Sequence, residues 1–85
     1  MAYRIEWHRA AGRAFDRLPT QIQARVGRAI DGLAADPRPS GTRSVVSGAG
    51  ELRLRVGDYR VIYEVDDRAQ TVLVVKIAHR GDAYR

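Results

Sequence analysis

The sequence predicts an α+β fold, in which residues 1–85 form a single small β-α-α-β-β-β domain. A helical hairpin covers one face of a mostly antiparallel four-stranded sheet. Three observations predict this fold. A chain of 85 residues is long enough for one domain. Two adjacent segments place apolar residues three and four positions apart, as helices do. The remaining apolar segments alternate or are rich in β-branched residues, as strands are. Because only two helices are available, one face of the sheet should stay uncovered.

The N-terminal segment is predicted to form a strand and then a helix. Residues 2–8, AYRIEWH, alternate between apolar and polar side chains, which is typical of a half-buried strand. The helical spacing then begins at about Arg9. Because the residue before a proline avoids the α region, Pro19 should end this helix near Arg17 or Leu18.

A second helix should follow at once. Thr20 is predicted to be its N-cap, and Gln23 lies three residues on, as in a capping box. The apolar stripe continues to about Ala35, and two helices joined by so short a turn should be antiparallel. Residues 36–50, DPRPSGTRSVVSGAG, are predicted to be a loop because proline, glycine and serine are so frequent there.

The C-terminal half is predicted to contain three strands. Residues 51–65, ELRLRVGDYRVIYEV, are two alternating runs joined at Gly57-Asp58, where a hairpin turn is favoured. Residues 71–78, TVLVVKIA, are apolar and β-branched, as in a central strand. If the aliphatic side chains of the hairpin face the core, three arginines share the opposite face: Arg53, Arg55 and Arg60.

Charge and composition narrow the function classes. The net charge is +5, and all but one of the fifteen basic residues are arginine. Arginine binds phosphate in bidentate geometry and stacks on bases, so a nucleic-acid partner is favoured. A genome rich in G and C, which encodes arginine in place of lysine, gives the same composition.

The sequence disfavours a metal or cofactor site, a membrane-spanning segment and export from the cell. The chain has no cysteine, and its two histidines and scattered carboxylates have no metal-ligand spacing, so we expect no metal and no cofactor. There is no run of 18 apolar residues and no segment of signal-peptide type. We therefore expect a cytoplasmic protein without a membrane partner.

The sequence resembles the RelE/ParE superfamily of bacterial type II toxins. The resemblance lies in residues 2–19, AYRIEWHRAAGRAFDRLP, residues 52–67, LRLRVGDYRVIYEVDD, and the tail 79–85, HRGDAYR. It implies a RelE-like fold and an adjacent gene for a neutralising antitoxin. Members of the RelE branch cleave mRNA in the ribosomal A site without metal, whereas members of the ParE branch poison DNA gyrase. The RelE branch is favoured here.

The resemblance also implies site residues. Arg60 matches the family arginine that contacts the scissile phosphate, and Arg53 and Arg80 fall at positions that are usually basic. Tyr84 resembles a C-terminal tyrosine that stacks on a base and aids proton transfer, and His79 lies at a neighbouring site position. RNA-binding roles are expected for the remaining basic residues near the site: Arg55, Lys76 and Arg85.

The sequence departs from the family at Glu51, where well-studied members have a lysine, and the C-terminal extension of longer members is missing. Cleavage by the RNA 2′-OH requires a base, stabilisation of the phosphorane and an acid for the leaving oxygen. Arginine supplies only the second of these. The candidates for the base are therefore His79, Tyr84 and Glu51. His79 and Tyr84 are favoured over Glu51.

Three functions remain open at this stage: a ribosome-dependent mRNA endonuclease, a gyrase inhibitor of the ParE type, and an RNA-binding relative without cleavage activity. The toxin functions predict an acidic, RelB-like antitoxin, since a cationic face and exposed sheet edges favour such a partner. The endonuclease also predicts the ribosome and mRNA as partners, and an antitoxin partner implies a toxin–antitoxin hetero-oligomer.

Overall fold

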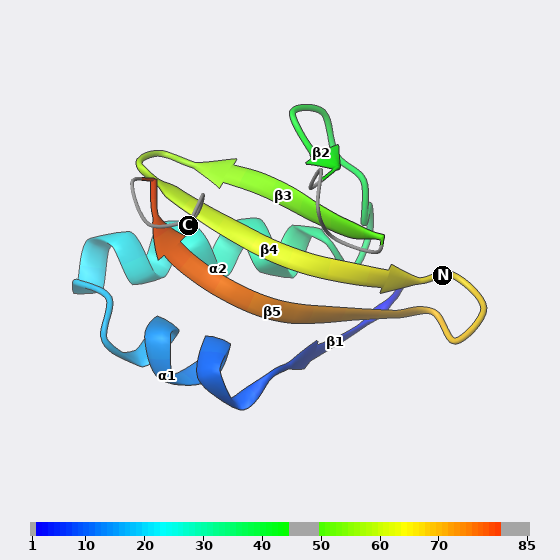
Figure 1. The fold of residues 1–85 in the computed structure, drawn as a ribbon, viewed down its shortest axis with the longest axis horizontal. Coiled ribbons are helices and arrows are strands. Elements are labelled where there is room, and N and C mark those ends of the chain that lie inside the picture. The colour runs from blue at the N-terminus through cyan, green and yellow to red at the C-terminus, as the bar shows by residue number, and fades with distance from the viewer. Residues whose placement is uncertain (1, 45–49, 81–85) are drawn as a thin grey trace.

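One sheet of five strands organises the molecule, in the order β1-β5-β4-β3-β2 (Figure 1). The structure is a computed structural model that describes residues 2–44 and 50–80. The elements along the chain are β1 (Arg4–Trp7), α1 (Arg9–Asp16), α2 (Thr20–Gly32), β2 (Arg43–Ser44), β3 (Glu51–Val56), β4 (Tyr59–Asp66) and β5 (Thr71–His79). The α+β class is confirmed, whereas the strand count of four was wrong.

The additional strand is β2, which lies in the segment predicted to be a loop. It pairs with β3 through only two residues, Arg43 opposite Arg53 and Ser44 opposite Leu52. Two residues are too few to give an alternating pattern in the sequence, and proline and glycine surround them. Only the neighbouring strand β3 makes this short strand possible.

Strand β5 lies between β1 and β4, so the β-branched residues 71–78 do form an inner strand (Figure 1). β5 is antiparallel to β4, which is antiparallel to β3. β1 pairs with β5 in parallel, Ile5 lying opposite Val72. A register shift interrupts the β4–β5 pairing between Ile62 and Tyr63.

Both helices contribute to a single core against one face of the sheet. Fully buried side chains from the helices meet fully buried side chains from the strands; they include Ala11, Val26, Ile30, Leu33, Val61, Tyr63, Val72 and Val74. Figure 1 shows α2 behind the strands. Gly27 of α2 lies against the ring of Phe15 in α1, where an added Cβ would be 3.4 Å from Cζ. A glycine at this position therefore permits a close approach of the two helices.

The helix ends differ in detail from the prediction. Pro19, rather than Thr20, is the N-cap of α2, and Thr20 is already helical. Gln23 does not complete a capping box, because its amide donates to the carbonyl oxygen of Phe15 over 3.0 Å. α2 ends at Gly32, three residues before the predicted end. α1 starts at Arg9 as predicted, and His8 caps it by accepting a hydrogen bond from the Ala10 N–H.

Among the described residues, no helix is both long and apolar enough to cross a membrane.

Candidate functional site

Arginines stand directly opposite one another on neighbouring strands. Arg43 of β2 is in register with Arg53 of β3, and Arg55 of β3 is in register with Arg60 of β4. Like charges in directly opposed positions of an antiparallel pair repel each other and destabilise the sheet. Because side chains alternate along each strand, these arginines lie on the face opposite the buried Leu54 and Val61. The arginine face predicted from the sequence is therefore present, and it includes one arginine more than was expected.

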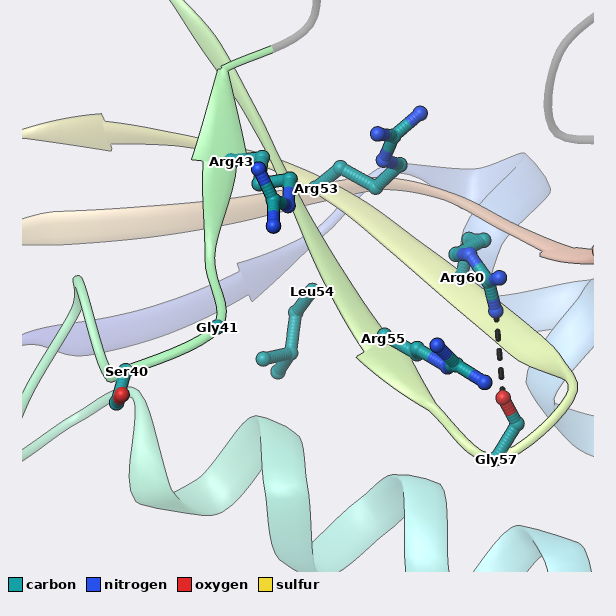
Figure 2. Close-up of a pocket in the computed structure, with 8 residues that line it drawn as sticks. All are labelled: Ser40, Gly41, Arg43, Arg53, Leu54, Arg55, Gly57 and Arg60. Carbon is teal, nitrogen blue, oxygen red and sulfur yellow. Dashed lines mark hydrogen bonds between the residues drawn. The ribbon is translucent and has the colours of Figure 1, made fainter.

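These four arginines line a pocket of about 490 Å³, which we call the arginine pocket (Figure 2). The described residues that line it are Ser40, Gly41, Arg43, Arg53, Leu54, Arg55, Gly57 and Arg60, and none of them is a carboxylate. The pocket follows β3 beyond the two residues that β2 pairs with. In Figure 2 the Arg55 and Arg60 side chains both extend toward the Gly57 end of the hairpin. Such a concentration of positive charge favours an anion as ligand.

Arg60 is the most buried of the four, with 8% of its surface exposed. Its Nη1 donates to two carbonyl oxygens, that of Tyr59 over 3.0 Å and that of Gly57 over 3.3 Å. Neither bond neutralises its charge. The two ion pairs between described residues lie elsewhere, at Arg4–Glu6 and Arg38–Asp67. A nearly buried guanidinium held by neutral acceptors is costly unless an anion completes it.

The wall formed by Ser40 and Gly41 is held in place from the core. The hydroxyl of Tyr63, a fully buried residue, donates to the Pro37 carbonyl oxygen over 2.6 Å and lies 3.5 Å from Thr42 Oγ1. Burial raises the pKa of Tyr63, so its hydroxyl stays a donor to higher pH than usual. The loop is therefore fixed to the sheet that carries Arg55 and Arg60.

A second anchor holds the start of the same loop. Arg38 donates to both carboxylate oxygens of Asp67, over 2.9 and 3.0 Å, and the Tyr3 hydroxyl donates to Asp67 over 2.7 Å. The Arg38 hydrogen bonds, followed by that from Tyr3, lower the pKa of Asp67. The hydrogen bond to Asp67 raises the pKa of Tyr3.

The other predicted site residues in the described part of the chain do not line the arginine pocket. Lys76 lies opposite Ile62, on the same face as Arg53, but does not line the arginine pocket. His79 lies opposite Tyr59, so it is on the helix-facing side of the sheet. Arg80 follows β5, and its backbone N–H donates to the Asp58 carbonyl oxygen over 2.6 Å. The predicted residues Tyr84 and Arg85 lie outside the described part of the chain.

Sequence reasoning missed Arg43 and the loop residue Ser40. Nothing in the spacing of residues 36–50 placed either near the hairpin. The available signal was a basic residue, Arg43, two positions after Pro39-Ser40-Gly41 and two positions before Val45-Val46. Within the described ranges 2–44 and 50–80, no group of three or more histidines or carboxylates could hold a metal ion.

Known proteins share both the sequence and the fold. Residues 5–84 match the family model of the ParE toxin of the type II toxin–antitoxin system parDE. Toxin RelG of Mycobacterium tuberculosis is 34% identical over 100% of this chain and 99% of its own length. The chain belongs to the RelE/ParE superfamily of toxins. It is therefore the toxin of a toxin–antitoxin system. Toxin RelE of the same organism is 33% identical over 98% of this chain and 87% of its own length.

Solved structures of this RelE/ParE toxin family agree with that membership. The archaeal RelE–RelB complex of Pyrococcus horikoshii superposes with a TM-score of 0.84 and 31% identity, over 96% of this chain and 99% of that one. The toxin–antitoxin complex RelBE2 of M. tuberculosis gives 0.82 and 31%, over 96% and 95%. Isolated Escherichia coli RelE, at 17% identity over 98% and 92%, shares the fold with a TM-score of 0.80. The relatives named RelE and RelG favour the RelE branch.

Proposed function

We propose that this toxin is a ribosome-dependent endoribonuclease that inhibits translation by cutting mRNA in the A site without a metal. The arginine pocket carries the proposal. Arg55 and Arg60 oppose each other across two strands, and no described carboxylate lines the pocket. The electrostatic repulsion is relieved when a phosphate lies between the guanidinium groups, because charge-assisted hydrogen bonds to phosphate are strong and often bidentate.

The chemistry that fits such a pocket is transesterification within the RNA. The ribose 2′-oxygen attacks the adjacent phosphorus, the P–O5′ bond breaks, and a 2′,3′-cyclic phosphate and a 5′-hydroxyl result. The 2′ proton passes to a base, and the leaving 5′-oxygen takes up a proton. Arg60 and Arg55 stabilise the charge on the phosphorane, which is the contribution expected of preorganised donors.

The described residues of the arginine pocket include no carboxylate or histidine that could transfer the protons. Glu51 is opposite Glu64 at the other end of the hairpin and does not line the arginine pocket. His79 lies on the helix-facing side of the sheet, although close to the turn. Tyr84 remains the proposed proton-transfer group, on the resemblance alone. A toxin with modest acid–base chemistry suits a reaction in which the ribosome orients the RNA, because orientation by itself lowers a barrier by several kcal/mol.

The test is cleavage of a defined message on stalled ribosomes, with the 5′ ends mapped. The wild-type chain should cut within the A-site codon in the presence of EDTA, and Arg60→Ala should reduce the rate about 100-fold or more. Arg28→Ala, an equal change of charge on the exposed side of α2, should cut normally. Absence of A-site cuts, or full activity of Arg60→Ala, would reject the endonuclease.

Inhibition of DNA gyrase is the second candidate function. It is favoured by the name of the matching family model, which is that of a ParE toxin, and by the lack of an acid–base side chain among the described residues of the arginine pocket. A supercoiling assay with detection of cleavage complexes separates the two functions. The endonuclease predicts no effect on gyrase.

We also propose an acidic antitoxin as the partner of this toxin in the cytoplasm. The solved relative from Pyrococcus horikoshii is a complex of RelE with RelB. The one from M. tuberculosis is the toxin–antitoxin complex RelBE2. The net charge of +5 and the sheet edges at β1 and β2 suit an acidic segment that adds a strand or lies across the arginine face. Co-expression with the protein encoded next to the toxin should restore growth and yield a stable complex. Toxicity unchanged by that neighbour would reject the pairing.

A further inference from the structure

A second pocket lies on the other side of the hairpin turn from the arginine pocket. Its volume is about 320 Å³, and we call it the turn pocket. It is lined by Ile22, Arg25, Val56, Gly57, Asp58, Tyr59 and His79. Gly57 lines both pockets, so the tip of the β3–β4 hairpin is their common rim. A flexible ligand that occupies the arginine pocket can therefore reach the turn pocket by passing over one residue.

Two guanidinium groups approach Gly57 from the two pockets. From the arginine pocket, Arg60 Nη1 donates to the Gly57 carbonyl oxygen over 3.3 Å. From the turn pocket, Arg25 Nη2 lies 3.2 Å from the position that a Cβ atom at residue 57 would occupy. Gly57 has a φ of +59°, a conformation that glycine adopts without strain. Because residue 57 has no side chain, the guanidinium groups of Arg25 and Arg60 can both lie close to the hairpin turn.

The turn pocket differs in character from the arginine pocket. Tyr59 and His79 lie edge to face, with ring centroids 5.4 Å apart and an interplanar angle of 87°. Ile22 and Val56 add apolar walls, and Asp58 adds hydrogen-bond acceptors. Aromatic rings with an apolar wall and a few polar groups suit a nucleobase, which stacks on aromatic side chains and hydrogen-bonds along its edge. Arg25, at the rim beside Gly57, suits the phosphate that joins this base to the rest of the strand.

We propose that the toxin holds two consecutive positions of a single RNA strand, one on each side of the β3–β4 turn. The scissile phosphate lies in the arginine pocket, the strand crosses Gly57, Arg25 binds the next phosphate, and the following base lies against Tyr59 and His79. This inference rests on the proposed function, since it extends the same RNA site. It makes His79 a base-contacting residue rather than the proton acceptor that the sequence suggested.

Arg25→Gln tests the phosphate contact, with Arg28→Gln as the matched control. Both arginines are exposed on α2, and Arg28 lines neither pocket. Affinity for a short single-stranded RNA is measured over a range of salt concentrations. Arg25→Gln should weaken binding about fivefold and lower the slope of log affinity against log salt by about 0.7, the value for one phosphate contact on a single strand. Arg28→Gln should change both quantities much less.

The base contact is tested with RNAs that carry one abasic nucleotide at successive positions. The wild-type chain should lose about fivefold or more in affinity at one position, as expected when a stacked base is removed. His79→Ala, an exposed substitution, should bind the intact RNA more weakly and lose this discrimination. Equal affinity of the wild-type chain for intact and abasic RNAs would overturn the inference.

Arg60→Ala in the same binding assay distinguishes a failure of the second RNA position from a failure of the proposed function. If Arg60→Ala loses binding while Arg25→Gln behaves like Arg28→Gln, the second position is wrong and the proposed function stands. If neither Arg60→Ala nor Arg25→Gln changes binding, RNA does not occupy this surface and both fail. Absence of any RNA binding at low salt would also overturn the inference, and cleavage on ribosomes would then decide the function independently.

Discussion

The hydroxyl of Tyr63 donates a 2.6 Å hydrogen bond to the carbonyl oxygen of Pro37, twenty-six residues earlier in the chain. Tyr63 is a fully buried core residue, whereas Pro37 starts the loop whose next residues form one wall of the arginine pocket. One wall of the pocket is therefore held by a polar atom at the margin of the hydrophobic core, together with the Arg38–Asp67 anchor.

Tyr63→Phe should lower the free energy of unfolding by about 1 kcal/mol, since it removes one hydrogen bond and leaves a partly buried carbonyl without its partner. Urea denaturation measures this change. Tyr3→Phe removes a hydroxyl bond at an exposed position and should be less costly. RNA affinity should also fall in Tyr63→Phe, because the loop wall loosens. Equal stability of the two variants would contradict the role given to Tyr63.

The lowered pKa of Asp67 predicts how the free energy of unfolding changes with pH. Its pKa is lowered in the folded protein by hydrogen bonds from Arg38 and then from Tyr3, so its contribution is present above the unfolded pKa and is lost as pH falls through the folded one. Asp67→Asn should therefore unfold at lower urea than the wild type at about pH 7, and the difference should shrink as the pH falls below the ordinary pKa of an aspartate. The effect is small, because the pair is exposed. A gap that widens in acid would contradict this account.

Arg55→Glu should separate stability from function. The substitution replaces a like-charge pair with an opposite-charge pair across from Arg60, which should raise the free energy of unfolding by about 0.2–1 kcal/mol. It also puts a carboxylate into the arginine pocket, so RNA binding should be abolished. Urea denaturation and RNA titration measure the two effects. Arg28→Glu, with the same change in net charge, should retain most RNA binding; equal losses in both variants would mean that only net charge matters.

Gly12→Ala should stabilise the protein by about 0.5–1 kcal/mol, because glycine inside a helix has excess conformational freedom when unfolded. Gly12 lies within α1, and an added Cβ would meet nothing within 4 Å. The melting temperature should rise by a few degrees. Gly57→Ala is the opposite case: its positive φ and the nearby Arg25 predict destabilisation. A loss of stability in Gly12→Ala would contradict the packing seen here.

The hairpin, the helices and the arginine face were predictable from sequence because each depends on local spacing. Alternation alone places Arg55 and Arg60 on one face, once Gly57 turns the chain. The parallel pairing of β1 with β5, and the two-residue strand that brings Arg43 to the pocket, depend on contacts between distant segments. No local pattern encodes them.

The position of His79 in the site could not be predicted from the sequence alone. The sequence places it one residue from Arg80 and near the arginines, but strand alternation and its register with Tyr59 put its ring on the helix-facing side. Proximity along the chain therefore suggested a proton acceptor where the structure has an aromatic pocket. The register of β5, which the shift at Ile62/Tyr63 affects, was needed to see the difference.

The sheet order has a consequence for biosynthesis. β5 is the last of the described strands to leave the ribosome, yet both β1 and β4 need it as their neighbour. Until β5 emerges, β1 lacks the strand that it pairs with and β4 lacks one of its two neighbours, so the sheet is incomplete. The complete sheet therefore forms only after residues 71–79 have been synthesised, so the folded toxin appears late in its own synthesis.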